Sequence, residues 1–263
     1  MGNKPLGQSF VIVALAGLAA AFQHGDRDQL AHEARRAGHR LSGALASEDR
    51  TLRLAAVAAA PNAQVPWVML APLAKLARSK DRREAASAAW TAARIANGLD
   101  RQTVLDQDYP VDLLHERMAA WREVARDRGR WPDVRVHALE TAAALHRALG
   151  SDAMQAPFDL ASTAADPEPE VRRAVFELLP APLPDELIAM VARRVTDDGE
   201  PAVALAAAQA LCLGIALDAD PAPLVEALGD AGLARIAELA ATSGMSAAAM
   251  ADAQRCLDAA GRR

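Results

Sequence analysis

The sequence predicts an all-α protein, a right-handed α-solenoid of about five to six helical hairpins. Its hydrophobic share is 52%, yet aromatic residues make up only 3% and alanine is abundant, which suits helices packed at short range. Strand-like runs of Val, Ile, Thr and aromatic residues are scarce after the first 25 positions. A short motif also recurs at spacings of 37 and 32 residues, which are typical of a stacked array.

The recurring motif is Pro-x-Val followed by a helical pattern, and it begins at Pro132, Pro169 and Pro201. Each proline can occupy the first position of a helix, where its missing N–H is not needed. We therefore expect each proline to start the second helix of a hairpin. Apolar residues with helical spacing follow each proline: Val134, Ala138, Thr141, Ala142 and Leu145; Val171, Ala174, Val175, Leu178 and Leu179; Val203, Ala206, Ala207, Ala210 and Leu211.

Two weaker hairpins precede these three. One covers Leu41–Ala60, and the other has Leu70–Leu76 as its first helix and Arg82–Ile95 as its second. A proline inside a helix bends it, so Pro72 predicts a kink in the first of these two helices. Stacked arrays need polar end caps, and we expect these from residues 26–46 and 224–261.

At these residues the chain resembles the HEAT-repeat family, including the HEAT-like repeats of phycobilisome lyases. The family carries a proline two residues before a Val-Arg pair and an aspartate six residues before that arginine. The resemblance covers roughly residues 41–215, and it implies a curved stack that binds partners on one face. The signature residues here are Pro132, Val134, Arg135, Asp166, Pro169, Val171, Arg172, Asp198, Pro201 and Val203.

The resemblance also implies a ladder in which aspartate and arginine of successive repeats alternate. Asp166 with Arg172 matches the family pattern fully, whereas alanine replaces the arginine that should follow Asp198. Ser47 and Gly129 stand where the aspartate would precede Arg53 and Arg135. We therefore expect an incomplete ladder.

Charge is distributed unevenly along the chain. Residues 1–147 hold 21 Lys and Arg against 16 Asp and Glu, and residues 148–263 hold 8 against 18. This polarity favours an acidic partner on the first half or two copies head to tail, the alternative being an ordinary solvated surface. The candidate partner-binding basic residues are Arg78, Lys80, Arg82, Arg83, Arg122, Arg126, Arg128 and Arg130.

The N-terminus resembles a secretory signal peptide over residues 1–21, because Lys4 precedes an apolar run from Phe10 to Phe22, in which Ala19-Ala20-Ala21 offers a small-residue cleavage site. The alternative is that this run is the first helix of the solenoid. Its 13 residues are fewer than the roughly 20 that a membrane-spanning helix needs, so no transmembrane segment is expected. Residues 22–263 would then form the repeat domain of an exported or periplasmic protein, the alternative being a cytoplasmic one. Arginine outnumbers lysine, which points to a GC-rich bacterial source.

The two cysteines, Cys212 and Cys256, lie among apolar residues. Buried free thiols are the expected state. Export would allow a disulfide between the last two helical units, but the sequence leaves open whether they are bonded.

Catalytic patterns are missing: the chain contains no GxSxG, GxxxxGK[ST] or GxGxxG. Two His-Glu dipeptides, His32-Glu33 and His115-Glu116, resemble the pairs that bind di-iron in the deoxyhypusine hydroxylase family. That family uses four such pairs, and adjacent helical residues point about 100° apart, so we expect ordinary surface residues. His137 is expected to be a hydrogen-bonded core histidine.

These observations favour a non-catalytic protein–protein interaction scaffold that needs no cofactor. The alternatives are an enzyme or accessory of the lyase-like or di-iron type, and a nucleic-acid-binding repeat protein similar to helical-repeat DNA glycosylases. The net negative charge and the few aromatic residues disfavour the nucleic-acid-binding alternative. Among the four tryptophans, Trp67, Trp90, Trp121 and Trp131, we expect Trp90 and Trp121 to be buried.

Overall fold

The computed structural model describes residues 38–261 apart from 64, 107–108, 151–159, 182, 217–220 and 242–246. Within these residues all regular structure is helical. The chain forms two compact units, Met1–Leu149 (unit 1) and Gly150–Arg263 (unit 2). The prediction of an all-α fold built from helical hairpins is confirmed. The predicted leader, residues 1–21, lies outside the described residues.

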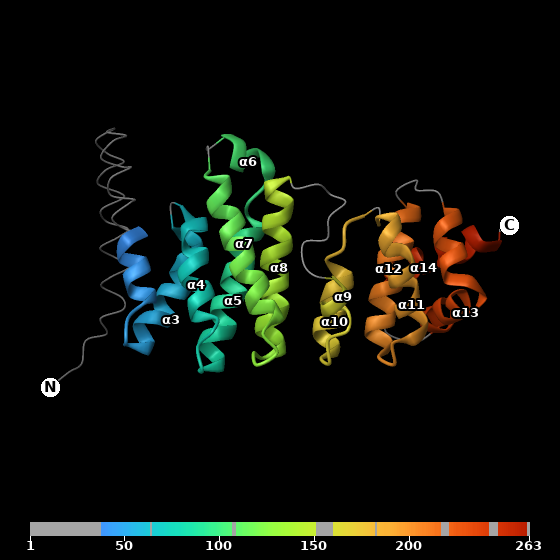
Figure 1. Cartoon of the computed structure of the whole chain (residues 1–263), viewed down its shortest axis with the longest axis horizontal. Helices are drawn as coiled ribbons and strands as arrows, with labels where there is room; N and C mark the ends of the chain where they lie inside the picture. Colours follow the sequence, from blue (N-terminus) through green and yellow to red (C-terminus); the bar gives the residue numbers. More distant parts are fainter. Residues whose placement is uncertain are drawn as a thin grey trace. The chain divides into compact units, whose positions relative to one another are not determined.

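Unit 1 contains three helical hairpins among its described residues (Figure 1). Residues 38–45 are helical and are joined to α3 by a short turn. The remaining connection between α5 and α7 holds a short extra helix, α6. The bounds are α3 (Arg50–Ala59), η1 (Ala60–Asn62), η2 (Pro66–Met69), α4 (Leu70–Leu76), α5 (Arg82–Asn97), α6 (Arg101–Asp106), α7 (Val111–Arg126) and α8 (Pro132–Leu149).

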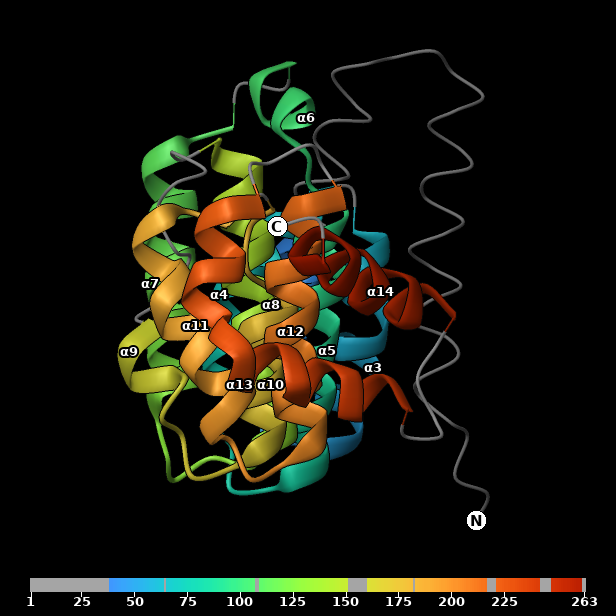
Figure 2. The same ribbon diagram turned by 90° about the vertical axis from the view of Figure 1, so that its right-hand side faces the viewer.

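The hairpins of unit 1 stack so that like helices meet. The second helices form one layer, in which α3 packs on α5 and α5 packs on α8, and the first helices α4 and α7 form the other. Figure 2 shows α7 on one side of the unit and α3 with α5 on the other. This two-layer stacking is the arrangement expected of repeat hairpins that hide their apolar faces against their neighbours.

Unit 2 repeats the same plan. Its second helices α10, α12 and α14 pack in series, and α11 packs on α13. With the three hairpins of unit 1, the described residues hold six helix pairs, at the upper end of the predicted range. The bounds are α9 (Leu160–Thr163), α10 (Pro169–Glu177), α11 (Asp185–Asp197), α12 (Pro201–Ala216), α13 (Pro221–Ala241) and α14 (Ala247–Gly261).

Two local devices start the second helices. Pro132, Pro169 and Pro201 each open their helix, as predicted. In the first two hairpins of unit 1, which lack this proline, an aspartate is the N-cap: Asp49 accepts from the backbone N–H of Thr51 at 2.8 Å, and Asp81 caps α5. Such a cap satisfies an N–H that has no partner within the helix.

Alanine fills the space between the helices. The buried face of α5 is made mostly of Ala85, Ala88, Ala89, Ala92, Ala93 and Ala96. Small side chains allow α5 to lie between α3 and α8, and larger buried groups, such as Trp121 of α7 and Leu139 of α8, lie on the neighbouring helices. The predicted stripes after the three prolines are buried, except that Leu178, Leu179 and Ala210 are half-buried.

Two expectations differ from the structure. Pro72 does not kink a longer helix: the chain is 3₁₀ over Pro66–Met69 and α4 begins only at Leu70, so Pro72 lies in the first turn, where no N–H is required. Cys212 and Cys256 are not free thiols but form a disulfide, with Cα atoms 5.4 Å apart. The bond joins α12 to α14, because these two second helices pack side by side.

Candidate protein-interaction surface

The signature arginine of unit 2 connects two repeats. Arg172 donates from Nε and Nη2 to the two carboxylate oxygens of Asp198 at 2.8 and 2.9 Å. Its Nη1 donates to the backbone carbonyls of Asp166 and Pro167 at 2.9 and 3.1 Å. The side chain thus holds the turn of its own hairpin and binds the next turn. Asp198 serves as acceptor although Ala204 replaces the arginine of its own repeat.

Arg53 of unit 1 makes the same two kinds of contact. Its Nη1 donates to the carbonyls of Ser47 and Glu48 at 2.7 and 2.8 Å, and its Nε and Nη2 donate to Glu84 at 3.1 and 2.5 Å. The acceptor here is a glutamate in the first turn of α5, steadied by the hydroxyl of Ser79 at 3.0 Å. Glu84 therefore accepts from Arg53 as Asp198 accepts from Arg172, which the sequence pattern did not reveal.

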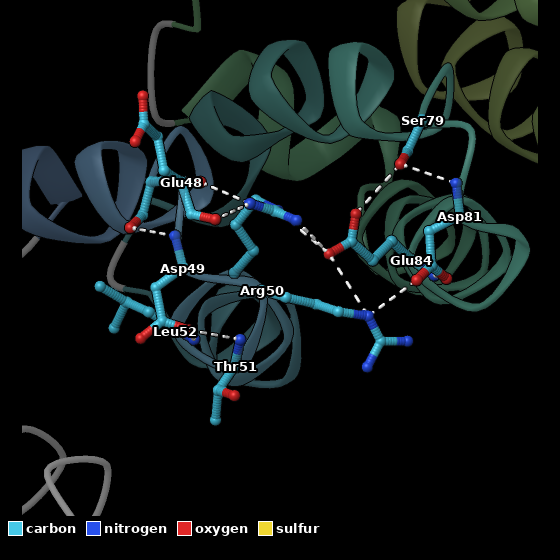
Figure 3. Close-up of polar contacts among 10 residues, drawn as sticks. Glu48, Asp49, Arg50, Thr51, Leu52, Ser79, Asp81 and Glu84 are labelled. Carbon is cyan, nitrogen blue, oxygen red and sulfur yellow. Dashed lines mark hydrogen bonds and ion pairs between the residues drawn. The ribbon is translucent and has the colours of Figure 1, made fainter.

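Figure 3 shows the outer part of this contact, where Arg50 reaches Asp81 beside Glu84. The Arg50 Nε lies 2.7 Å from an Asp81 carboxylate oxygen. The hydrogen bond from Arg50 is the main reason that the pKa of Asp81 lies below its ordinary value. Two neighbouring arginines of α3 thus bind two acidic groups of α5 and join the first two hairpins.

Arg135 lies deeper than Arg53 and Arg172. The residue is only 2% exposed, and its Nε donates to the carbonyl of Ala125 at 2.9 Å, near the end of α7. This contact holds the second helix of its hairpin to the first.

The two predicted arginine clusters of unit 1 meet at one end of the unit, and we call this region the turn-end basic surface, comprising the eight residues predicted from the sequence. Arg130, from the turn before α8, donates from Nη1 to the carbonyl of Arg78, from the turn before α5, at 2.5 Å. Arg82 of α5 lies 3.3 Å from Asp133 of α8, and Arg78 lies 2.9 Å from Glu123 of α7. These contacts join turns that are far apart in the sequence.

The acidic groups at this end are already neutralised. Asp127 pairs with Arg130 at 2.8 Å, and Asp133 and Glu123 pair with the arginines named above. The hydrogen bond from Arg130 is the first cause of the lowered pKa of Asp127. These pairings leave a surplus of positive charge on this surface.

Three exposed cations carry much of this surplus: Lys80, Arg83 and Arg126. Over the described part of the chain, none of these three has a carboxylate within ion-pair distance. Arg122 lies one helical turn before Arg126 and is half-buried. Its pKa is lowered by burial and then by the charge of Arg126. Such crowding of like charges favours a partner that brings negative groups.

The weak metal-site alternative finds little support in geometry. His115 and Glu116 are both exposed on α7, and Glu116 lies 3.9 Å from Arg117. His32 and Glu33 lie outside the described residues. Within the described ranges, no group of three or more His, Cys, Asp or Glu side chains is placed to hold a metal ion.

Two further side chains differ from expectation. His137 is hydrogen-bonded, with Nδ1 2.7 Å from Glu140, but it is half-exposed rather than in the core. Trp121 is fully buried as predicted, whereas Trp90 is 49% exposed. The prediction that Trp90 is buried was wrong, because the helices that pack on α5 leave this side chain half uncovered.

Unit 2 has an open polar cleft of about 260 Å³ between its first two turns, lined by Asp166, Arg172, Arg194, Asp197, Asp198 and adjacent small residues. Its main groups, Arg172 and Asp198, already bind each other. The cleft is therefore part of the repeat-to-repeat contact. Over the described residues, no helix combines the length and hydrophobicity needed to cross a bilayer.

No protein-family model and no curated protein sequence matches the chain. Several solved structures resemble the chain in fold, including these three. A designed armadillo repeat protein has a TM-score of 0.49 and 18% identity, with 97% of this chain and 100% of that chain covered. An engineered protein has a TM-score of 0.48 and 18% identity, with 93% of this chain and 95% of that chain covered. A chain from a study of microtubule plus end tracking by XMAP215, CLIP-170 and EB1 has a TM-score of 0.47 and 16% identity, with 84% of this chain and 89% of that chain covered.

Proposed function

We propose that this protein is a non-catalytic scaffold that binds an acidic surface of a protein partner through the turn-end basic surface of unit 1. The observation that supports this proposal is the convergence of two arginine clusters whose neighbouring carboxylates are already paired. Lys80, Arg83 and Arg126, which pair with no carboxylate of the described residues, then remain for a partner. Charge of one sign gathered on a surface steers association and selects complementary partners.

A charge-reversal comparison tests this proposal. The triple variant Lys80→Glu, Arg83→Glu and Arg126→Glu changes the surface, and the control Arg40→Glu, Arg101→Glu and Arg193→Glu makes the same change in charge at exposed cations elsewhere. Wild type and both variants would be immobilised, and proteins retained from an extract of the native source would be eluted with rising salt. We expect acidic proteins on wild type and control and their loss on the triple variant. Retention of the same proteins by all three would refute the proposal.

We also propose that the scaffold acts in an oxidising compartment. The support is the disulfide between the chain's two cysteines, since such bonds persist mainly outside the reducing cytosol. Protein purified from its native source under thiol-blocking conditions should carry no blocked cysteine, and N-terminal sequencing should find the predicted leader removed. Two blocked thiols in freshly isolated protein would contradict the assignment.

A further inference from the structure

The outward face of α5 carries a cationic stripe around an exposed tryptophan. Arg83, Ser87, Trp90, Arg94 and Asn97 follow spacings of four, three, four and three residues, so they lie along one face of the helix. Each is exposed or half-exposed. Tryptophan is highly buried on average, and here the neighbouring α3 and α8 leave Trp90 half uncovered. We call these five residues the α5 stripe.

The tryptophan is held in place by its neighbour one turn along. The guanidinium carbon of Arg94 lies 4.8 Å from the centroid of the Trp90 ring, which is the geometry of a cation–π contact. At the far end, Arg147 of α8 donates to the Asn97 side-chain oxygen at 3.1 Å. The ring is thus oriented before any partner arrives, and this lowers the entropy that binding would cost.

The stripe itself has no acidic residue. The carboxylates nearest to its start are occupied, since Asp81 pairs with Arg50 and Glu84 with Arg53. On α8, Glu140 pairs with His137. Over the described residues, neither Arg83 nor Arg94 has a carboxylate within ion-pair distance. Two cations therefore flank the exposed ring without internal neutralisation.

These features suit one kind of occupant. Tryptophan and arginine are the residues most enriched among those that dominate binding energy at protein interfaces. The positive flanks require negative groups, and the ring requires an apolar or aromatic side chain. Arg83 also belongs to the turn-end basic surface, so the stripe continues the surface proposed for the partner.

We propose that the α5 stripe binds an extended acidic segment of a protein partner, with an aromatic side chain of that segment against Trp90 and carboxylates at Arg83 and Arg94. The inference rests on the proposed function and names the chemistry of the partner. Along a helix with a rise of 1.5 Å per residue, Trp90 lies about 10 Å from Arg83 and about 6 Å from Arg94. An extended chain rises about 3.3 Å per residue, so the carboxylates should lie about three residues from the aromatic residue on one side and about two on the other.

Synthetic peptides test the inference directly with the full-length protein. The first probe is a fluorescein-labelled Gly/Ser peptide of about twelve residues with one Phe, Glu at three residues before it and Glu at two residues after it; a second has these spacings reversed. In the third, Ala replaces the Phe, and in the fourth, Lys replaces each Glu. Fluorescence anisotropy gives the affinity, and labelled oligothymidylate of similar length tests for nucleic acid.

We expect one of the two Phe-Glu peptides to bind at least about tenfold more tightly than the Ala peptide, as loss of a dominant interface side chain implies. Trp90→Ala should remove that difference in affinity, and Arg94→Gln should weaken binding of the Phe-Glu peptide. The matched control Leu105→Ala, a change at an apolar residue that is 62% exposed on α6, should leave both values unchanged. The Lys80/Arg83/Arg126 charge reversal should weaken the binding of every Glu-bearing peptide.

The outcomes separate the two proposals. Equal binding of the Phe and Ala peptides, unaffected by Trp90→Ala but lost on charge reversal, would overturn the stripe and leave the scaffold function standing. Trp90-dependent binding that survives reversal of Lys80 and Arg126 alone, which leaves the Arg83 of the stripe in place, would do the opposite. Tighter binding of oligothymidylate than of any peptide, or a Trp90-dependent dimer in sedimentation without peptide, would overturn the acidic-segment assignment.

Discussion

At the scale of the residue, Arg53 and Arg172 have the same role in different units. Each is the fourth residue of its helix. Both donate to two carbonyls of the preceding turn, and both bind an acidic group in the next repeat. The acceptors are nearly inaccessible, with side-chain exposures of 2% for both Glu84 and Asp198. A buried carboxylate needs its partner, because an unpaired charge in the interior is costly.

Removal of the Arg172 side chain should therefore destabilise the protein. We expect Arg172→Ala to lower the free energy of unfolding by about 3 kcal/mol, since it leaves Asp198 buried and unpaired. Arg173→Ala is the control: its pair with Glu177 is half-exposed and should contribute less than about 1 kcal/mol. Urea denaturation measures both, and equal losses in the two variants would contradict this account.

The same ion pair should make stability depend on pH. Burial alone would raise the pKa of Asp198, but the hydrogen bonds from Arg172 and from the Glu200 backbone N–H outweigh it, so the pKa lies below its ordinary 3.8. Folding therefore favours the ionised carboxylate of Asp198. The stability that this carboxylate contributes is fully present above its pKa in the unfolded chain, and it is lost as the pH falls through its lower pKa in the folded protein. Urea midpoints measured from about pH 6 to about pH 3 should fall further for wild type than for Asp198→Asn. Parallel curves would exclude Asp198 as a source of the pH dependence.

At the scale of the element, single proline and glycine residues decide where helices begin and where one of them is interrupted. Pro132, Pro169 and Pro201 open their helices, and Pro72 is accommodated because α4 starts just before it. The long helix α13 is interrupted at Gly229, with φ 56° and ψ −174°. This conformation is accessible essentially only to glycine.

Alanine at position 229 should therefore strain the backbone. We expect Gly229→Ala to destabilise unit 2 by about 1–3 kcal/mol, although open space surrounds the position where its Cβ would lie. Gly199→Ala is the matched control, because that position also has open space and lacks a positive φ. Thermal unfolding followed by circular dichroism compares the two, and an unchanged midpoint for Gly229→Ala would show that α13 is continuous in solution.

At the scale of the whole molecule, the disulfide joins residues 44 apart in sequence and ties α14 to α12. Closing a loop of this length stabilises a protein by about 2–4 kcal/mol. We expect Cys212→Ala, Cys256→Ala and the double variant to lose similar amounts, because each removes the same bond, and intact mass should rise by about 2 Da on reduction of wild type. Thermal melts give the losses; additive effects of the two single variants, or no mass change, would show free thiols.

Charge is also distributed at the scale of the units. Unit 1 spans the net positive part of the sequence and unit 2 the net negative part. Sequence counts predicted this polarity, but they could not show which arginines remain for a partner. Arg78, Arg82 and Arg130 are used within unit 1, whereas Lys80, Arg83 and Arg126 are left unpaired by the described residues.

The sequence alone determined the all-α class, the start of each proline-led helix and the buried stripes, because these depend on residues within one or two helical turns of each other. Tertiary structure decided the rest: Glu84 as the acceptor for Arg53, the bond between Cys212 and Cys256, and the exposure of Trp90. Each of these depends on how closely one hairpin packs on the next. A helical period indicates which face of α5 is apolar, but the width that its neighbours cover is fixed only when the repeats stack.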